Sequence, residues 1–352
     1  MTKKAVFVGI SLALSTLSAQ AAPNPTLDGQ QAGGLNGVMV ATPLGAIRQH
    51  ALALENRLSI FGLVEPDAKG EPHLRPVGDV QLYGSAEAGR YKLKEEGIKP
   101  GFKAHTQVLN LGGDRMVTRN ALVGLGISVD SANTSLENGR GSFDNDLVLG
   151  TVFTTIALSP SMYVNGQVNF GRVNYDINRI GSVPGTATGS TSALYQAARI
   201  GGGFIHNFSH GITLNPQISY TEEQLKMDGY SETGTSPLLL RYNPTKYKSQ
   251  RVSLGAIATI APSTPHGWRP VARFSFEHDL NDDGVVVGVG QAAGGPIQTA
   301  KGDQPDRNYE LLSLAAIKEL QNGGLINLQL ATTLGFKDLT SYSLSATYKH
   351  PF

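Results

Sequence analysis

Cysteine is absent from the chain, and charged residues are scarce. Of the 352 residues 16% are charged, and the formal net charge is +1, whereas about 25% is usual in soluble domains. Without cysteine there is no disulfide framework, thiolate metal site or cysteine nucleophile. A near-neutral chain also lacks the basic stripe of a nucleic-acid-binding protein. Beyond the N-terminus no apolar run reaches the ~18 residues of a transmembrane helix, which excludes helical membrane spans.

The first 21 residues have the pattern of a secretory signal peptide. Lys3 and Lys4 precede an apolar stretch, and Ala19 and Ala21 form the small-x-small pattern that signal peptidase accepts. An uncleaved anchor is the alternative, but the apolar run is short for a span and no stop-transfer charges follow it. We therefore expect cleavage after Ala21 and export of a protein that keeps almost no net charge.

From about Val77 to the C-terminus, apolar and polar residues alternate with period two. The segments 162–174, 212–221 and 341–352 show the alternation most clearly. Such a pattern places apolar side chains on one face of a β-strand and polar side chains on the other. The sequence therefore predicts a chain of β-strands that each have one apolar face.

The predicted connections between the strands are of two lengths. The short ones consist of Gly, Pro, Ser, Asn and Asp, the residues typical of hairpin turns. They are Gly112–Arg115, Ser159–Ser161, Ser209–Gly211, Ser263–Gly267 and Gln321–Gly324. Longer polar stretches alternate with them at about 92–101, 130–144, 179–194, 229–247, 281–307 and 336–340. These connections predict about twelve strands.

Short and long connections at alternate ends favour an all-β fold, an antiparallel transmembrane β-barrel of about twelve strands. Outer-membrane barrels have short periplasmic turns and longer outer loops, whereas a β-sandwich has no reason to sort its connections. The polar faces also carry charges that a wet lumen accepts and a dry sandwich core does not. These charges are Glu87, Arg199, Arg251, Arg273 and Glu277. At the C-terminus, Tyr348 and the terminal Phe352 fit a lipid-facing last strand.

Several stretches resemble the C-terminal translocator barrel of classical autotransporters, and most closely the branch whose passengers are GDSL-type esterases. The resemblance covers roughly 44–352. It is carried by "RQHALALENRLS" at 48–59, "ISYTEEQLKMDGYSETG" at 218–234, "ARFSFEHDLNDD" at 272–283 and the closing "YSLSATYKHPF". The resemblance implies a barrel inserted by the outer-membrane assembly machinery with the help of periplasmic chaperones. It also implies an α-helix in the pore, which in that family links the barrel to a passenger.

A helix is also predicted from the residues themselves. Leu44, Ile47, Ala51, Leu54 and Leu58 recur at helical spacing and form one apolar stripe. At 1.5 Å per residue, 44–61 would be on the order of 27 Å long, about the height of the apolar band of such a barrel. A periplasmic helix or a short coiled coil is the alternative. Charges beside the stripe could pair with luminal charges, and they are Arg48, Glu55 and Arg57.

The chain departs from that family in the segment before the helix. Residues 22–43 are rich in Gly and Pro, and we expect a disordered tail in place of a passenger domain. The esterase residues of the family have no counterpart, and we expect no enzyme. The expected organisation is a signal peptide at 1–21, this tail, a pore helix at 44–62, a linker at 63–76 and the barrel at 77–352.

The remaining chemistry is sparse. The eight His residues have no metal-ligand spacing, and "NDDG" at 281–284 lacks the spaced acids of a calcium loop. We expect no metal, cofactor or nucleic acid, and a monomer in contact with outer-membrane lipid. Two functions remain open: a type V secretion translocator with little or no passenger, or a porin-like or structural barrel whose function lies in loops 229–247 and 281–307.

Overall fold

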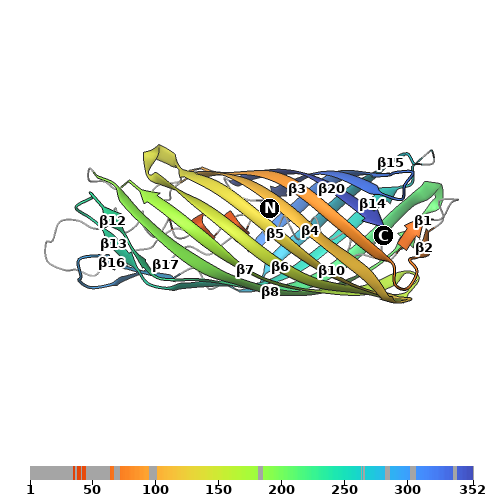
Figure 1. The fold of residues 1–352 in the computed structure, drawn as a ribbon, viewed down its shortest axis with the longest axis horizontal. Helices are drawn as coiled ribbons and strands as arrows, with labels where there is room; N and C mark the ends of the chain where they lie inside the picture. Colours follow the sequence, from red (N-terminus) through yellow and green to blue (C-terminus); the bar gives the residue numbers. More distant parts are fainter. Residues whose placement is uncertain are drawn as a thin grey trace, which may run out of the picture.

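The computed structural model describes residues 35, 38–40, 42–44, 64–66, 72–94, 101–180, 185–262, 264, 266–281, 286–301, 307–335 and 339–351. Most of these residues form one closed barrel of twelve antiparallel strands (Figure 1). The barrel strands are β3 (Val80–Leu93), β4 (Phe102–Thr118), β5 (Ala121–Leu136), β6 (Gly141–Ser159), β7 (Met162–Arg179), β8 (Ala187–Phe204), β10 (Ile212–Met227), β14 (Thr245–Ile260), β15 (Trp268–Asp279), β18 (Asn308–Glu319), β19 (Leu325–Leu334) and β20 (Leu339–Pro351).

Each barrel strand pairs with the strand before and after it in the chain. Two pairings complete the ring: β20 pairs with β3, with Ser345 opposite Glu87, and β8 pairs with β10, with Arg199 opposite Thr221. Because the ring is closed, it has no unpaired sheet edge. The predicted β-barrel and its twelve strands are confirmed.

Side chains alternate between the lumen and the outer surface, as the period-two pattern predicts. On β4, Leu109 and Leu111 are each 64% exposed on the outside, whereas Val108 and Asn110, which alternate with them, are buried. On β20, Tyr342 and Leu344 point outward, and Ser343 between them is buried. The apolar face of the strands is therefore the outer face of the barrel.

Two of the predicted connections are wrong. Gly112–Arg115 lies inside β4, and the turn to β5 is at 119–120. The loop expected at 130–144 is mostly strand, because β5 and β6 are joined only by the short helix η2 (Glu137–Gly139). Asn138 and Gly139 both have positive φ there, 59° and 67°, as a tight Asn-Gly hairpin turn requires.

The two ends of the barrel differ. At the end with turns 119–120, 160–161, 205–211, 261–267 and 320–324, called here the short-turn end, the connections include only β9 (His206–Asn207) and η3 (Ser209–Gly211). At the opposite, long-loop end, two connections fold into strands. β11 (Tyr230–Ser231), β13 (Leu240–Tyr242), β16 (Val286–Gln291) and β17 (Gln298–Lys301) form a four-stranded sheet, the mouth sheet, and β12 (Thr233–Gly234) pairs with β8. These strands lie at one end of the barrel in Figure 1.

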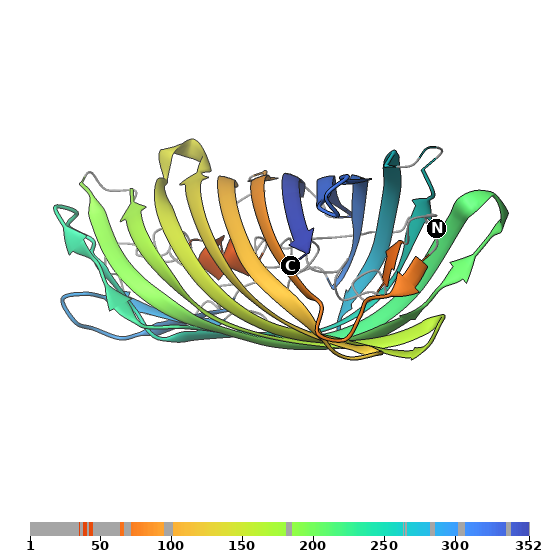
Figure 2. The same ribbon diagram turned by 45° about the vertical axis from the view of Figure 1, so that its right-hand side comes forward.

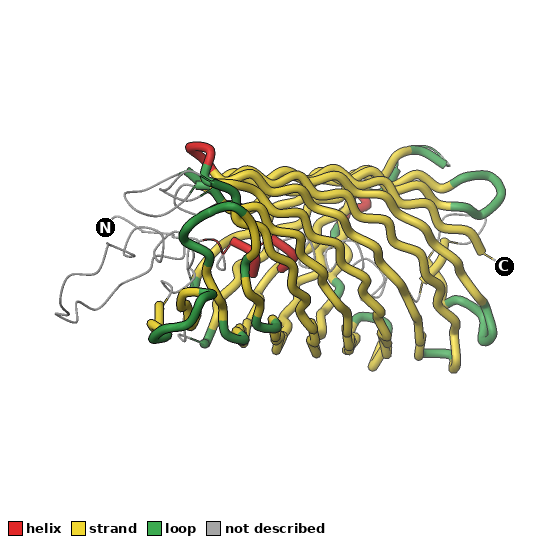
Figure 3. The backbone as a smooth tube through the Cα atoms, turned by 60° about the vertical axis from the view of Figure 1, so that its left-hand side comes forward, coloured by secondary structure: helices red, strands yellow, loops and turns green. Residues whose placement is uncertain are grey.

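The N-terminal part contributes a helix and a hairpin. The described helical residues are Leu35, 38–40 and 42–44, and all but Leu44 lie within the segment expected to be a disordered tail. For these residues that expectation is wrong, because apolar residues among the glycines are buried by the barrel. The predicted pore helix at 44–62 lies outside the described residues except for Leu44. Figures 2 and 3 show the helical residues enclosed by the barrel strands, while β1 (Val64–Pro66) and β2 (Pro72–Leu74) lie at the short-turn end.

Candidate functional site

The lumen is the candidate site, and its long-loop half is an apolar core around the helical residues. Leu35, Met39 and Leu44 are at most 3% exposed. They share one cluster of buried side chains with aromatic residues on the lumen face of the strands and with the mouth sheet. These partners include Tyr91, Phe143, Tyr175, Tyr195, Tyr242, Val287 and Val289. The helix, the wall and the mouth sheet therefore close this end of the lumen together.

Polar contacts fix the helical residues in place. The Tyr175 hydroxyl on β7 donates to the backbone carbonyl of Met39 over 3.0 Å in a buried position. Within the helix, the Thr42 hydroxyl donates to the Val38 carbonyl at 2.9 Å. A buried carbonyl without a partner would be costly, so Tyr175 specifies where this segment sits along the pore.

The middle of the lumen carries the charges that the sequence singled out. On β14, Arg251 pairs through Nη1 with Glu223 of β10 and through Nε with Glu277 of β15, both at 3.1 Å. Ser253 and Ser275 donate to Glu277 at 2.7 and 2.9 Å. The structure thus brings Arg251 and Glu277 together in one buried network.

The other predicted luminal charges lie on β15, β8 and β3. Arg273 on β15 is 3% exposed, and Arg199 on β8 is half-buried. Glu87 on β3 lies on the opposite side of the ring and is 7% exposed. The predicted helix charges Arg48, Glu55 and Arg57 lie outside the described residues.

Sequence reasoning missed Glu223, which shares Arg251 with Glu277 and accepts a hydrogen bond from Tyr195 at 3.2 Å. It lies beside Glu222 in the chain, and only one of two adjacent residues on a strand can face the lumen. The strand register that decides this was not available from the sequence alone. Asp130 was missed because its segment was assigned to a loop.

A buried ion pair attaches the mouth sheet to the barrel rim. Arg179 at the end of β7 donates through Nε and Nη2 to the two carboxylate oxygens of Glu232, each at 2.7 Å. Glu232 also accepts from the Leu240 amide at 2.9 Å and from the Tyr242 hydroxyl at 3.2 Å. Burial raises the pKa of Tyr242 well above its usual value, so this phenol stays protonated and can donate. The ring of Tyr230 stacks on it at 4.3 Å.

A second buried cluster lies at the short-turn end. Arg75, in the segment before β3, donates through Nε to Asp79 at 2.6 Å and through Nη1 to Asp114 of β4 at 2.7 Å. Backbone hydrogen bonds from the Gly78 amide to Met116 and from the Met116 amide to Asp79 extend the contact. The segment that enters the first barrel strand is therefore bound to the neighbouring strand.

The outer surface is suited to lipid. Exposed aromatic residues gather near the short-turn end, where outer-membrane barrels carry an aromatic girdle. They are Phe204, Phe208, Trp268 and Tyr348, each 43–49% exposed. The terminal Phe352 lies outside the described residues. Among the described residues, no helix is long and apolar enough to cross a membrane, and no group of three or more His, Asp or Glu could hold a metal ion.

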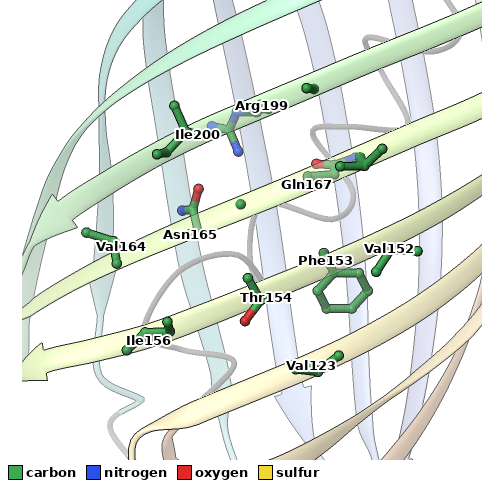
Figure 4. A pocket seen from close by; sticks show the side chains of 13 residues that line it. Val123, Val152, Phe153, Thr154, Ile156, Val164, Asn165, Gln167, Arg199 and Ile200 are labelled. Carbon is green, nitrogen blue, oxygen red and sulfur yellow. The ribbon is translucent and has the colours of Figure 1, made fainter.

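A shallow groove interrupts the outer face between β6, β7 and β8. Its volume is about 470 Å³. Figure 4 shows Val152, Val164 and Ile200 on neighbouring strands around it. Gly166 forms part of its floor because it has no side chain. The groove is apolar and belongs to the lipid-facing surface, so it is not a site for a polar substrate.

A closed antiparallel barrel with an apolar outer face and a polar lumen that holds an N-terminal helical segment defines an outer-membrane β-barrel protein. The chain belongs to the autotransporter beta-domain family, whose model matches residues 82–322. It is a translocator-type barrel of type V secretion, located in the bacterial outer membrane and in contact with lipid.

Solved translocator domains have the same fold. The translocator domain of autotransporter NalP from Neisseria meningitidis is 17% identical with a TM-score of 0.67, covering 88% of this chain and 98% of that one. The beta domain of the Bordetella autotransporter BrkA is 13% identical with a TM-score of 0.60, covering 79% and 100%. The transport unit of AIDA-I from Escherichia coli is 13% identical with a TM-score of 0.52, covering 86% and 97%. No curated protein sequence matches the chain.

Proposed function

We propose that this barrel carries the N-terminal segment of its own chain across the outer membrane and then retains the end of that segment as a plug. The observation that supports this most directly is the burial of Leu35, Met39 and Leu44 in the lumen, with Tyr175 bonded to Met39. A segment that had passed through the pore would come to rest in this way. An open channel would instead need a water-filled path along its lumen.

The luminal charges have a proposed role in holding the plug. Arg251, Arg273, Glu277 and Arg199 would pair with Arg48, Glu55 and Arg57 of a pore helix that continues through 44–62. Opposite charges in a low-dielectric lumen attract more strongly than in water. This helix, the linker at 63–76 and a signal peptide at 1–21 that is cleaved after Ala21 are part of the proposal.

We further propose how the protein reaches the outer membrane. Periplasmic chaperones would deliver the exported chain, and the barrel assembly machinery would recognise the last strand through Tyr348 and Phe352.

The closed ring needs no second copy to cover an edge, so we expect a monomer. The lumen holds a plug instead of a substrate pocket, and we expect no catalysis. The passenger, whatever its size, would be the segment before the helix.

The second candidate is a porin-like or structural barrel that acts through its outer loops. The ordered mouth sheet favours a surface role for loops 228–244 and 280–307, because such a sheet presents a fixed outer surface. In that case the N-terminal segment would enter the lumen from the periplasm and never reach the cell surface.

An epitope tag inserted after Ala22 distinguishes the two. The tag is probed with antibody on intact cells and on permeabilised cells. Two further tagged variants of the same chain calibrate the signal: a tag between Gly294 and Gly295 in the outer connection, and a tag at 321–322 in a short turn. A translocator gives labelling of the Ala22 tag on intact cells at the level of the first control. Labelling only after permeabilisation, as in the second control, refutes the proposal.

A further inference from the structure

One wall of the lumen carries buried polar atoms that have no hydrogen-bond partner among the residues that the structure describes. We call it the acceptor wall, and its residues lie on the lumen face of β3, β4, β5 and β6. They are Glu87, Thr106, Asn110, Asp130, Thr134 and Asn145, all at most 7% exposed. The unpartnered atoms are Glu87 Oε1, Thr106 Oγ1, Asn110 Oδ1, both carboxylate oxygens of Asp130, Thr134 Oγ1, and Oδ1 and Nδ2 of Asn145.

Strand register places these residues together. Glu87 and Asp130 lie opposite Val108 from either side, so the two carboxylates flank one residue of β4. Thr106 and Asn145 both lie opposite Ala132, one row nearer the long-loop end. Asn110 lies one row nearer the short-turn end and uses its Nδ2 to donate to Ser85 at 2.9 Å. The Ser343 hydroxyl forms a hydrogen bond with Glu87.

On the opposite wall of the lumen, the buried carboxylates do have partners. β14 lies opposite β4 in the ring of twelve strands. There, Glu223 and Glu277 pair with Arg251. Asp279 accepts from Ser249 at 2.6 Å and from the Gln250 amide at 3.1 Å. The unsatisfied carboxylates are therefore confined to one side of the lumen.

Buried polar groups in native proteins nearly always have partners, and an exception calls for an explanation such as a missing ligand. Burial without a partner is most costly for a carboxylate. On the acceptor wall all the unpartnered atoms but Asn145 Nδ2 are oxygens, so the wall suits a ligand that donates several hydrogen bonds and carries positive charge.

A single metal ion does not fit this layout. Glu87 and Asp130 are two strand spacings apart, about 10 Å between backbones, whereas a bound Mg²⁺ or Ca²⁺ holds its oxygens at roughly 2.0–2.6 Å. An ammonium group has three donors and a guanidinium group has five, both at the end of a long stem. Such a group can reach along the wall from a chain in the middle of the lumen.

We propose that the acceptor wall binds the lysine and arginine side chains of a segment passing through the lumen. This inference rests on the proposed translocation of the N-terminal segment. It adds that transport is selective: cationic segments find a binding surface on β3–β6, and acidic segments meet two buried carboxylates.

The resting state is tested first, on the purified full-length protein in detergent. The variant Glu87→Gln/Asp130→Asn removes both charges with little change of shape. The matched variant Glu222→Gln/Asp144→Asn removes two charges from exposed positions on β10 and β6. The melting midpoint is followed by the loss of the compact, fast-migrating form on unheated gels. Because buried carboxylate oxygens without partners destabilise the barrel, the first variant should melt about 5 °C higher than wild type, and the matched variant should melt as wild type does.

A lower midpoint for Glu87→Gln/Asp130→Asn would mean that the wall already holds a cation at rest, and would overturn the inference. Repeating the melts in potassium chloride and in choline chloride shows whether such a cation is a free ion or a side chain. A wild-type midpoint that depends on potassium, with the dependence lost in the variant, would assign the wall to a free ion instead of a side chain. Equal midpoints in both salts are expected.

Transport is tested in cells with two tags after Ala22, one with a lysine-rich flank and one with an aspartate-rich flank. In wild type the lysine-rich tag should reach the surface about tenfold faster, and Glu87→Gln/Asp130→Asn should abolish the difference. Equal rates of surface labelling for the two tags in wild type would refute the inference and leave the proposed function unaffected. Absence of both tags from the surface would refute the proposed function, and the inference with it.

Discussion

At the residue scale, the close fit between glycines and aromatic rings on the lumen face decides how tightly the wall can pack. The Phe153 ring on β6 lies directly over Gly124 on β5, and a Cβ added at Gly124 would overlap it. The neighbouring ring of Tyr163 and the side chain of Met116 fill the space on other sides of the same cluster. The ring therefore has little room to move away.

We expect Gly124→Ala to lower the melting midpoint by about 2–6 °C, because overpacking a core costs roughly 1–3 kcal/mol. Gly166→Ala is the matched control, since its Cβ would lie 3.7 Å from Thr154 Cγ2, an ordinary contact in the lipid-facing groove. That variant should melt at or slightly above the wild-type temperature. Loss of the compact form on gels measures both. Equal midpoints for the two variants would contradict the packing argument.

At the scale of elements, strand alternation could be predicted from the sequence, but two of the connections could not. Alternation depends only on which face meets lipid, and residues such as Leu109 and Leu111 report that directly. The connection between β5 and β6 was misplaced because the outward-facing residues at this end of β5 are polar as well, namely Ser131, Asn133 and Ser135, so the outward face has no apolar residues to mark a strand. The Asn138–Gly139 pair was the signal for the tight turn that was overlooked.

The network of luminal charges could be predicted only in part, because the sequence does not show which strands pair or in which register. The sequence indicates that Arg251 and Glu277 lie on polar faces, but not which strands become neighbours. Glu223 joins them only because β10 pairs with β14 over a long connection. The helical residues near Leu35 were missed because a glycine-rich segment has no apolar periodicity strong enough to predict a helix without the barrel around it.

The mouth sheet depends on one buried ion pair, and this gives a prediction for the element as a whole. Glu232→Gln would remove the carboxylate that two nitrogens of the buried Arg179 contact, and breaking such a buried pair costs about 3–5 kcal/mol. The connection 228–244 should then open far more often, and trypsin added to intact cells should cleave after Arg241 about a hundredfold faster. The cleavage fragment is quantified by mass spectrometry.

Glu222→Gln is the control for this experiment, since Glu222 is an exposed acid on β10 next to the buried Glu223. It should leave the rate of cleavage after Arg241 unchanged. If Glu232→Gln were cleaved no faster than this control, the Arg179–Glu232 pair would not be what holds the mouth sheet to the rim.

At the scale of the whole molecule, the lumen is closed by three structures along its length. The long-loop half holds the helical residues and the mouth sheet, and the middle holds the Arg251 network. The short-turn end holds the segment bound by Arg75. Because the helical residues, the mouth sheet and the segment bound by Arg75 each contact a different part of the wall, the plug and the barrel should unfold as one cooperative unit.

Arg75 is the residue on which this coupling depends most clearly, because its guanidinium joins Asp79 to Asp114 with its side chain fully buried. Arg75→Ala removes the positive charge between the two acids and should lower the melting midpoint by about 10 °C, since breaking a buried pair costs roughly 3–5 kcal/mol. Arg75→Ala/Asp114→Asn should recover part of that loss, because it also removes the buried negative charge. A double variant that melts at or below the single variant would show that Arg75 acts through packing and not through its charge.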